Sequence, residues 1–216
     1  MKRLILYDLD GTLVDTLQDI TIAANHMLAQ LCLPALTADE VKPFVGRGVL
    51  ELIARCLNTD GSDAIDHGMH VYRAYYGQHL MDHSRLYPGA RELLEHFTPR
   101  LQGVVTNKPN PYSTQLLEGL GVAGYFLEII GGEGTYPRKP SPAGVQALMA
   151  RAQAAADDTV FIGDSAVDVE TGRRAGIMTV TVGHGLGDES ELRAAQPDRF
   201  VADFAELLAL VREEAW

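Results

Sequence analysis

Short apolar runs recur along the chain, separated by longer stretches in which apolar residues fall at helical spacing. From residue 88 onwards the two kinds of segment alternate, which is typical of a parallel sheet covered by helices. The sequence therefore predicts an α/β fold. The runs that predict buried strands are 4–7 (LILY), 103–105 (GVV), 126–130 (FLEII), 159–162 (TVFI) and 179–182 (TVTV).

Residues 15–86 have a different pattern, without a run typical of a strand. Apolar residues at helical spacing between 17 and 31 predict an amphipathic helix, and VLELIARCL at 49–57 predicts another. We therefore expect two domains. Residues 1–14 and 87–216 would form a Rossmann-like core, a parallel sheet with helices on both faces, and 15–86 would form a small inserted α-helical cap domain.

The charge of the chain limits its partners. A formal net charge of −11 argues against a nucleic acid or an anionic membrane as the partner, but it allows a small anionic substrate held by a local cation or a bound metal. Only four apolar residues lie between Arg3 and Asp8, too few for a secretory signal, and no apolar run is long enough to span a membrane. We expect a cytoplasmic protein, a monomer or a weak homodimer.

Polar side chains suited to catalysis follow the predicted strands. Asp8 and Asp10 come directly after the first strand, where a buried carboxylate needs a metal, an ion pair or hydrogen bonds. Ligands of open parallel sheets bind at the carboxyl ends of the strands, so side chains from different strand ends are expected to converge there. The further candidates are Thr106, Asn107, Lys139, Asp164 and Asp168.

These side chains suit a metal ion and a phosphate ester. Asp8 and Asp164 offer the hard oxygen ligands that Mg²⁺ prefers, and this ion often shares its site with a phosphate. Lys139 and Thr106 add a positive charge and a hydroxyl donor for a phosphoryl group. Each loop alone is also consistent with a turn or a helix cap, but four such loops in order at one edge favour a site.

Four motifs occur in order over nearly the whole chain: DLDGT, VVTN, RKP and GDSAVD. In these motifs the chain resembles the phosphatases of the haloacid dehalogenase superfamily. Further segments resemble those of the phosphoglycolate phosphatases within that superfamily: VVTNKP, LLEGLGVAGYF, IIGGE, KPSP, FIGDS and VGRG. The resemblance implies hydrolysis through a covalent intermediate.

The resemblance gives Asp8 and Asp10 their roles. Asp8 would attack phosphorus and carry an aspartyl-phosphate. Asp10 would protonate the leaving oxygen and then take a proton from the water that hydrolyses the intermediate. The dehalogenases of the superfamily lack a carboxylate at the position of Asp10, because a halide needs no proton. Asp10 therefore favours phosphate-ester chemistry.

The resemblance also implies a Mg²⁺ site made of the Asp8 side chain, the backbone carbonyl of Asp10, and Asp164. Asp168 would support the metal through its waters or orient Lys139. The phosphoryl oxygens would be stabilised in the transition state by Thr106, the backbone at Asn107, and Lys139.

Gly46 and Arg47 are the candidates for substrate binding in the cap, and Gly48 follows them. The two glycines free the backbone, and the arginine offers a planar fork for a carboxylate or a phosphate. A helix-breaking loop with a solvated arginine explains the same residues equally well. Because an aspartyl-phosphate needs shielding from water, the cap would open and close on linkers at 11–15 and 85–90.

We therefore expect a Mg²⁺-dependent phosphatase of small phosphorylated metabolites, with 2-phosphoglycolate as the favoured substrate. A pyrophosphatase, a sugar-phosphate phosphatase or a mutase of the same superfamily is an alternative, since mutases keep both Asp8 and Asp10. Against a mutase, the loop at Thr106 lacks the serine-rich sequence of that branch. A non-catalytic binding protein on this fold is a third alternative, and the intact set of candidate residues argues against it.

Overall fold

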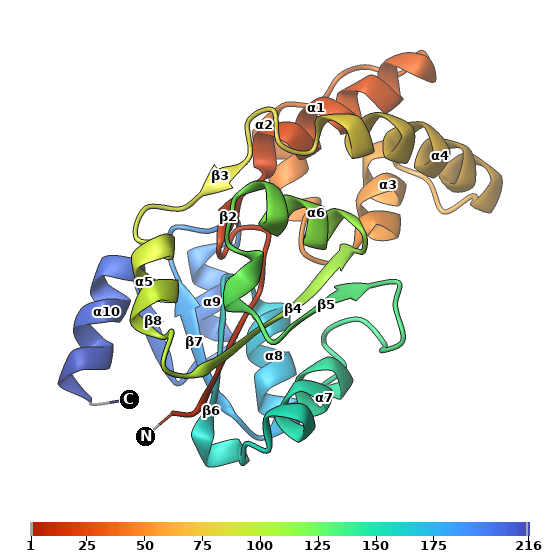
Figure 1. Ribbon diagram of the computed structural model, residues 1–216. Coiled ribbons are helices and arrows are strands. Elements are labelled where there is room, and N and C mark those ends of the chain that lie inside the picture. Colours follow the sequence, from red (N-terminus) through yellow and green to blue (C-terminus); the bar gives the residue numbers. More distant parts are fainter. Residues whose placement is uncertain (1, 215) are drawn as a thin grey trace.

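Six parallel strands form the central sheet in a computed structural model that describes residues 2–214 and 216 (Figure 1). Their order is β5-β4-β1-β6-β7-β8. All five strands predicted from the sequence are confirmed, whereas β8 was missed. It lies at the edge of the sheet with only its last residue buried, so it lacks the apolar run of a central strand. The strands are β1 (Leu4–Tyr7), β4 (Leu101–Pro109), β5 (Glu128–Gly132), β6 (Thr159–Gly163), β7 (Met178–Val182) and β8 (Arg199–Val201).

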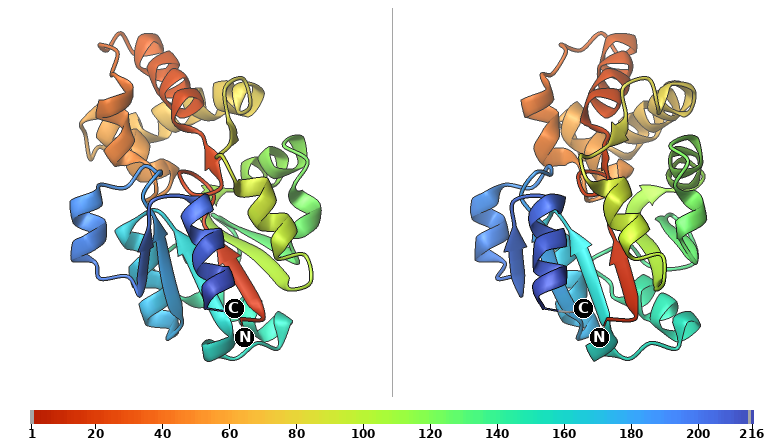
Figure 2. Two further views of the ribbon diagram at one scale, coloured as in Figure 1. Left: turned by 90° about the vertical axis from the view of Figure 1, so that its left-hand side faces the viewer. Right: turned by 60° about the vertical axis from the view of Figure 1, so that its left-hand side comes forward.

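Helices cover both faces of this sheet, as predicted (Figure 2). Side chains alternate across a strand, so Ile5 and Tyr7 belong to one apolar core while Leu4 and Leu6 belong to the other. The first core includes α5 (Ala90–His96), α6 (Tyr112–Gly119) and α10 (Phe204–Glu213), and the second includes α7 (Ala143–Ala152). The remaining helices of this part are α8 (Ala166–Ala175) and α9 (Glu189–Ala194).

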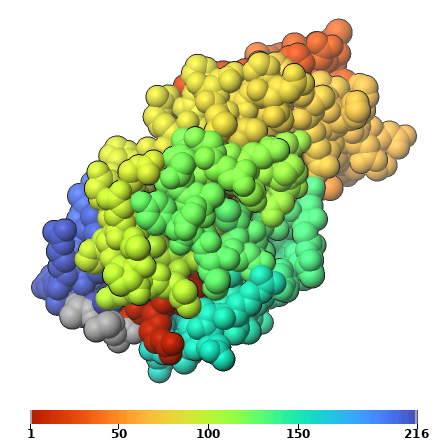
Figure 3. Space-filling model, in the orientation of Figure 1, coloured from red at the N-terminus to blue at the C-terminus, as the bar shows by residue number. Residues whose placement is uncertain are grey.

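Four helices lie within residues 15–86, a segment that we call the cap, over the carboxyl ends of the strands (Figure 1). They are α1 (Leu17–Gln30), α2 (Ala38–Val41), α3 (Val49–Leu57) and α4 (Ser62–His79). The buried apolar side chains of the cap belong to the same core as α5, α6 and α10. The space-filling view shows the cap in contact with the core around α6 (Figure 3), where Tyr76 of α4 packs edge-to-face on Tyr112.

The two linkers to the cap pair with each other. Strands β2 (Val14–Asp15) and β3 (Arg85–Leu86) form a short antiparallel ribbon, although the sequence predicted no strand there. Two residues are too few for an alternating pattern to be visible in a sequence. The ribbon brings both ends of the cap to one place on the core.

Asp19 ties the beginning of the cap to its end. This buried carboxylate near the start of α1 accepts hydrogen bonds from the backbone of His83 and Ser84 and from the Ser84 hydroxyl. These hydrogen bonds therefore hold the first and the last segment of the cap together next to the ribbon. Among the described residues, no helix is long and apolar enough to cross a membrane.

Candidate active site

The central strands of the sheet carry the candidate residues to one place. Strand β1 lies between β4 and β6, so the chain runs outward on both sides of it, as at the ligand-binding point of open α/β sheets. Asp8 follows β1, Thr106 lies near the end of β4, and Asp164 follows β6. All three side chains are buried. The predicted convergence is therefore present.

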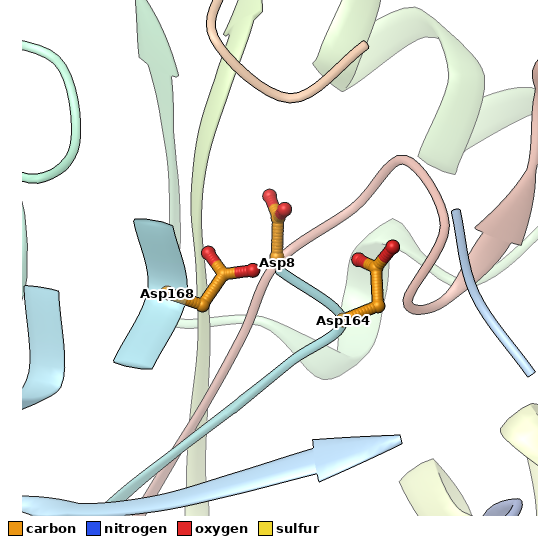
Figure 4. Close-up of side chains that lie close together, drawn as sticks. All are labelled: Asp8, Asp164 and Asp168. Atoms are coloured by element: carbon orange, nitrogen blue, oxygen red, sulfur yellow. The ribbon is translucent and has the colours of Figure 1, made fainter. Parts of the chain in front are cut away.

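Three carboxylates gather at this edge: Asp8, Asp164 and Asp168, each with one oxygen within 4.8 Å of the others. Figure 4 shows the carboxylates of Asp8 and Asp164 pointing to the same side, with Asp168 directed towards Asp8. Asp168 lies in the first turn of α8, where Ser165 and Asp168 form a reciprocal capping box. The helix start thus fixes the third carboxylate in place.

Asp164 is positioned by the loops after β1 and β7. Its Oδ1 accepts a hydrogen bond from Thr12 Oγ1 at 2.6 Å, and its Oδ2 accepts one from the backbone of Leu186 at 2.8 Å. Gly11 has a φ of +83°, and a Cβ there would lie 2.2 Å from Asp164 Oδ2, so only glycine fits. Thr12 received no role from the sequence, because its partner lies 152 residues away.

Burial makes ionisation of the Asp8 and Asp164 carboxyl groups unfavourable. It raises the pKa of Asp8 to about 6 although Lys139 pulls the other way. It raises the pKa of Asp164 to about 8, with the charges of Asp8 and Asp168 adding to the effect. Three buried carboxylates with one lysine between them leave an excess of negative charge. The oxygen donors and this excess fit a hard divalent cation such as Mg²⁺.

We expect the stability of the metal-free protein to fall as the pH rises. Asp8 and Asp164 keep protons in the folded state that the unfolded chain has already lost, between about pH 4 and the raised pKa values of about 6 and 8. The stability gained from those protons is complete below about pH 4 and lost as the pH passes the folded pKa values.

Mg²⁺ should reverse this loss because it binds only the ionised carboxylates. Thermal melts should therefore show a Mg²⁺-induced rise in Tm that is at least about twofold larger at pH 8.5 than at pH 5.5. Asp164→Asn should abolish most of the rise. A rise independent of pH and unaffected by Asp164→Asn would place the ion elsewhere.

Lys139 connects the nucleophile candidate to the carboxylate cluster. Its Nζ lies 2.7 Å from Asp8 Oδ1 and donates a hydrogen bond to Asp168 Oδ1 at 2.6 Å. Burial alone would lower the pKa of Lys139, but the charges of Asp168 and Asp8 outweigh burial and raise it. A fixed ammonium therefore lies beside Asp8. The orientation of Lys139 by Asp168, one of the two roles predicted for that aspartate, stays a prediction.

The side chain of Asn107 joins three loops, a role that the sequence did not reveal. Its amide nitrogen donates to the backbone oxygens of Gly46 and Lys139 at 2.9 and 3.1 Å, and its oxygen accepts from the Lys139 backbone at 2.8 Å. The sequence predicted only a backbone role for Asn107. Gly46, predicted as a substrate-binding residue, lies next to the site because of this contact.

Asp10 points to a different set of partners from Asp8. Its Oδ1 accepts hydrogen bonds from Thr16 Oγ1 and from Lys108 Nζ, both at 2.8 Å. The Asp10 side chain is not part of the three-carboxylate cluster, and its predicted metal contact through the backbone carbonyl stays a prediction. Lys108 is buried and was not singled out in the sequence. A usable signal was present, since residues two apart on a strand share a face and Lys108 follows Thr106 by two.

Two cavities adjoin both Asp8 and Asp10. The smaller one has about 40 Å³ open to the centre of a water-sized sphere and lies against Lys108 and the apolar side chains of Val49 and Leu52 in the cap. The larger one has about 380 Å³ by the same measure and is lined by the cations Lys42, Arg47 and Arg55. Arg47 therefore lies at the site, as predicted, but it is exposed and on the wide side.

Comparisons with known proteins agree with this geometry. The profile of the "haloacid dehalogenase-like hydrolase" family matches residues 5–182. The chain is 34% identical to a phosphoglycolate phosphatase of Vibrio parahaemolyticus, with 99% of this chain and 97% of that protein covered. It is 32% identical to a phosphoglycolate phosphatase of Haemophilus influenzae, with 97% and 98% covered. A crystal structure described as that of "a predicted phosphoglycolate phosphatase" from Haemophilus somnus superposes with a TM-score of 0.92 at 30% identity, covering 97% of this chain and 98% of that one.

Proposed function

The chain belongs to the haloacid dehalogenase-like hydrolases, and on this basis we propose that it is a Mg²⁺-dependent phosphatase of small phosphorylated metabolites, with 2-phosphoglycolate as its substrate. One observation carries the proposal. The buried Asp8 carboxylate contacts the Lys139 ammonium at 2.7 Å and is grouped with two further carboxylates, and Asp10 follows two residues later at the same cavities. A nucleophile, a cation and an acid are thus grouped as a phosphate ester requires.

Asp8 acts as the nucleophile in the proposed reaction. Its oxygen forms a bond to phosphorus while the bond from phosphorus to the ester oxygen breaks, and Asp10 gives that departing oxygen a proton. Water then forms a new bond to phosphorus as the bond to Asp8 breaks, and Asp10 accepts a proton from this water. Asp10 ends in the protonation state in which it began, so the cycle closes.

The phosphoryl oxygens are held by Lys139, the Thr106 hydroxyl and the backbone at Asn107 in this proposal. Lys139 supports it by its fixed position beside Asp8. Thr106 supports it by its burial at the end of β4, where its Oγ1 accepts a hydrogen bond from the Lys108 backbone at 3.2 Å and keeps its own proton to donate. Donors fixed in this way stabilise the charge of the transition state without reorganising.

The Mg²⁺ ion would be held by the carboxylates of Asp8 and Asp164 and the backbone carbonyl of Asp10, with Asp168 in support. When bound, the ion supplies positive charge that offsets the repulsion between Asp8 and the anionic phosphoryl group. We propose that the cap, residues 15–86, is a separate domain that opens and closes on the ribbon of β2 and β3 to keep other water out.

The relatives and the cations of the wide cavity support phosphoglycolate as the substrate. Two relatives, at 34% and 32% identity, are phosphoglycolate phosphatases. The wide cavity adjoins Asp8 and Asp10 and is lined by Lys42, Arg47 and Arg55, so it offers positive charge to the carboxylate of the leaving group. The test is an assay of purified protein with p-nitrophenyl phosphate, with and without Mg²⁺, followed by phosphoglycolate, pyrophosphate and hexose phosphates at fixed Mg²⁺. Activity on p-nitrophenyl phosphate that vanishes with EDTA, together with the highest kcat/KM for phosphoglycolate, is expected.

We expect Arg47→Ala to lower kcat/KM for phosphoglycolate by roughly ten- to a hundredfold, the loss expected for a hydrogen bond to a charged group. The side chain of Arg47 makes no hydrogen bond or ion pair to any described residue, so its guanidinium is available to the carboxylate of the substrate. p-Nitrophenyl phosphate has no carboxylate, and its kcat/KM should change little.

Arg55→Ala is the matched control for this measurement. Arg55 lines the same wide cavity, but Glu51 occupies its guanidinium at 2.7 Å. Equal losses for both substrates in Arg47→Ala would assign Arg47 to cap closure or folding. No loss for either substrate would leave it a solvated arginine.

A further inference from the structure

The carboxylate of Asp10 is held through one oxygen only. Oδ1 accepts both hydrogen bonds, from Thr16 Oγ1 and from Lys108 Nζ. Oδ2 accepts none from the described residues, and Asp10 lines both cavities. Oδ2 is therefore the oxygen placed to exchange a proton with a substrate or a water.

Lys108 is held in turn by a residue of the cap. Its Nζ donates to the hydroxyl of Tyr76 at 2.6 Å and lies 4.8 Å from the centre of the same ring. Lys108 belongs to β4 of the core, and Tyr76 belongs to α4 of the cap. The side chain of Lys108 is only 3% exposed, so its ammonium depends on Asp10 and Tyr76, in place of water, as partners.

The surroundings of Tyr76 fix its hydroxyl in place. The ring stacks on Tyr72 with centroids 5.3 Å apart and meets Tyr112 edge-to-face at 5.6 Å. Burial raises the pKa of Tyr76 well above that of a free tyrosine, so the phenol stays neutral and accepts the hydrogen bond from Lys108. A cap that moves away from the core would take this acceptor with it.

We propose that Tyr76 and Lys108 are positioning residues that couple the closed cap to proton transfer by Asp10. Tyr76 fixes the ammonium of Lys108, and Lys108 with Thr16 fixes Oδ1, which turns Oδ2 towards the reacting oxygen. When Oδ2 gives its proton to the leaving oxygen, the ammonium stabilises the carboxylate that remains, until Oδ2 takes a proton from the attacking water. With the cap open, Lys108 loses one partner and Asp10 is less well oriented. The inference rests on the role proposed above for Asp10.

Tyr76→Phe tests this coupling because it removes one hydroxyl and keeps the packing of the ring. Leaving groups that need a proton should suffer, so kcat for phosphoglycolate and ethyl phosphate should fall roughly tenfold. For p-nitrophenyl phosphate, whose leaving group departs without a proton, kcat should fall less than about twofold. The matched control is Tyr75→Phe, on the same helix, whose ring stacks between His26 and His79 away from the site. Tyr75→Phe should leave kcat unchanged for all three substrates.

A double-mutant cycle with Lys108→Met shows whether Tyr76 acts through Lys108. Lys108→Met should produce the same dependence on the leaving group, at least as large as that of Tyr76→Phe. Adding Tyr76→Phe to it should then cost nothing further. Additive losses, or equal losses for all three substrates, would overturn the coupling and reduce the contact to a packing interaction.

Asp10→Asn separates failure of this inference from failure of the proposed function. If Asp10→Asn shows the dependence on the leaving group and Tyr76→Phe does not, the coupling is wrong while the acid role stands. If Asp10→Asn itself shows no such dependence, the acid role is wrong, and the inference fails with it.

Discussion

Replacing Asp8 with asparagine should lower kcat by on the order of 10⁴ or more, the loss typical of deleting a catalytic nucleophile. Asparagine has nearly the same shape but lacks the charged oxygen that attacks phosphorus. It also removes one of the three carboxylates of the cluster and one of the two charged partners of Lys139. Attack, metal binding and the placement of Lys139 are all weakened by the one substitution.

The intermediate itself provides the decisive measurement. Rapid quenching of the wild-type enzyme with substrate should trap a phosphoryl group on the peptide that contains Asp8, and Asp8→Asn should give none. Asp157→Asn, the same substitution in the exposed turn that precedes β6, should keep normal activity, since Asp157 lies at the opposite end of that strand from Asp164. Substantial activity in Asp8→Asn, or a phosphoryl group on another peptide, would mean that another residue is the nucleophile.

The location of the site followed from the sequence because it depends on topology more than on detail. Asp8, Thr106 and Asp164 come directly after or at the end of buried strands, and parallel strands bring their carboxyl ends to one edge. Short apolar runs indicate such strands, and their alternation with helix-like segments distinguishes them from buried helices. The ribbon of β2 and β3, and edge strand β8, are too short or too exposed for such a run, so they were missed.

The partners of the site residues did not follow from the sequence. Thr12 matters because Asp164 lies against it, and Lys108 matters because Asp10 and Tyr76 flank it. Those contacts join segments 32 to 152 residues apart, and no local pattern encodes them.

The placement of Arg47 could be predicted only in part from the sequence. Its two glycine neighbours made it the natural choice for a substrate-binding cation in the cap. The structure places it, exposed, on the wide cavity, whereas the cation of the small cavity is Lys108. The sequence context identified a loop that reaches the site, and only the fold assigned each cation to a cavity.

Asp10→Asn should divide substrates by their leaving groups. For phosphoglycolate and ethyl phosphate we expect kcat to fall by on the order of 10²-fold or more, the usual contribution of a general acid. For p-nitrophenyl phosphate the fall should be about tenfold or less, because Asp8 still attacks and the leaving group departs without a proton. Steady-state rates of the three substrates at saturating Mg²⁺ measure the difference.

Two features of the structure sharpen the interpretation of this variant. The introduced asparagine would keep an oxygen for Thr16 but would leave the buried Lys108 ammonium without its charged partner, so Asp10→Asn should also lower the Tm. Lys108→Met added to Asp10→Asn removes the stranded charge and should recover part of that Tm without recovering the alkyl phosphatase rate. Recovery of the rate along with the Tm would show that the first loss came from the misplaced lysine.

Equal losses for all three substrates in Asp10→Asn would remove the carboxylate from proton transfer, and a water or a different side chain would then have to carry the proton to the leaving oxygen.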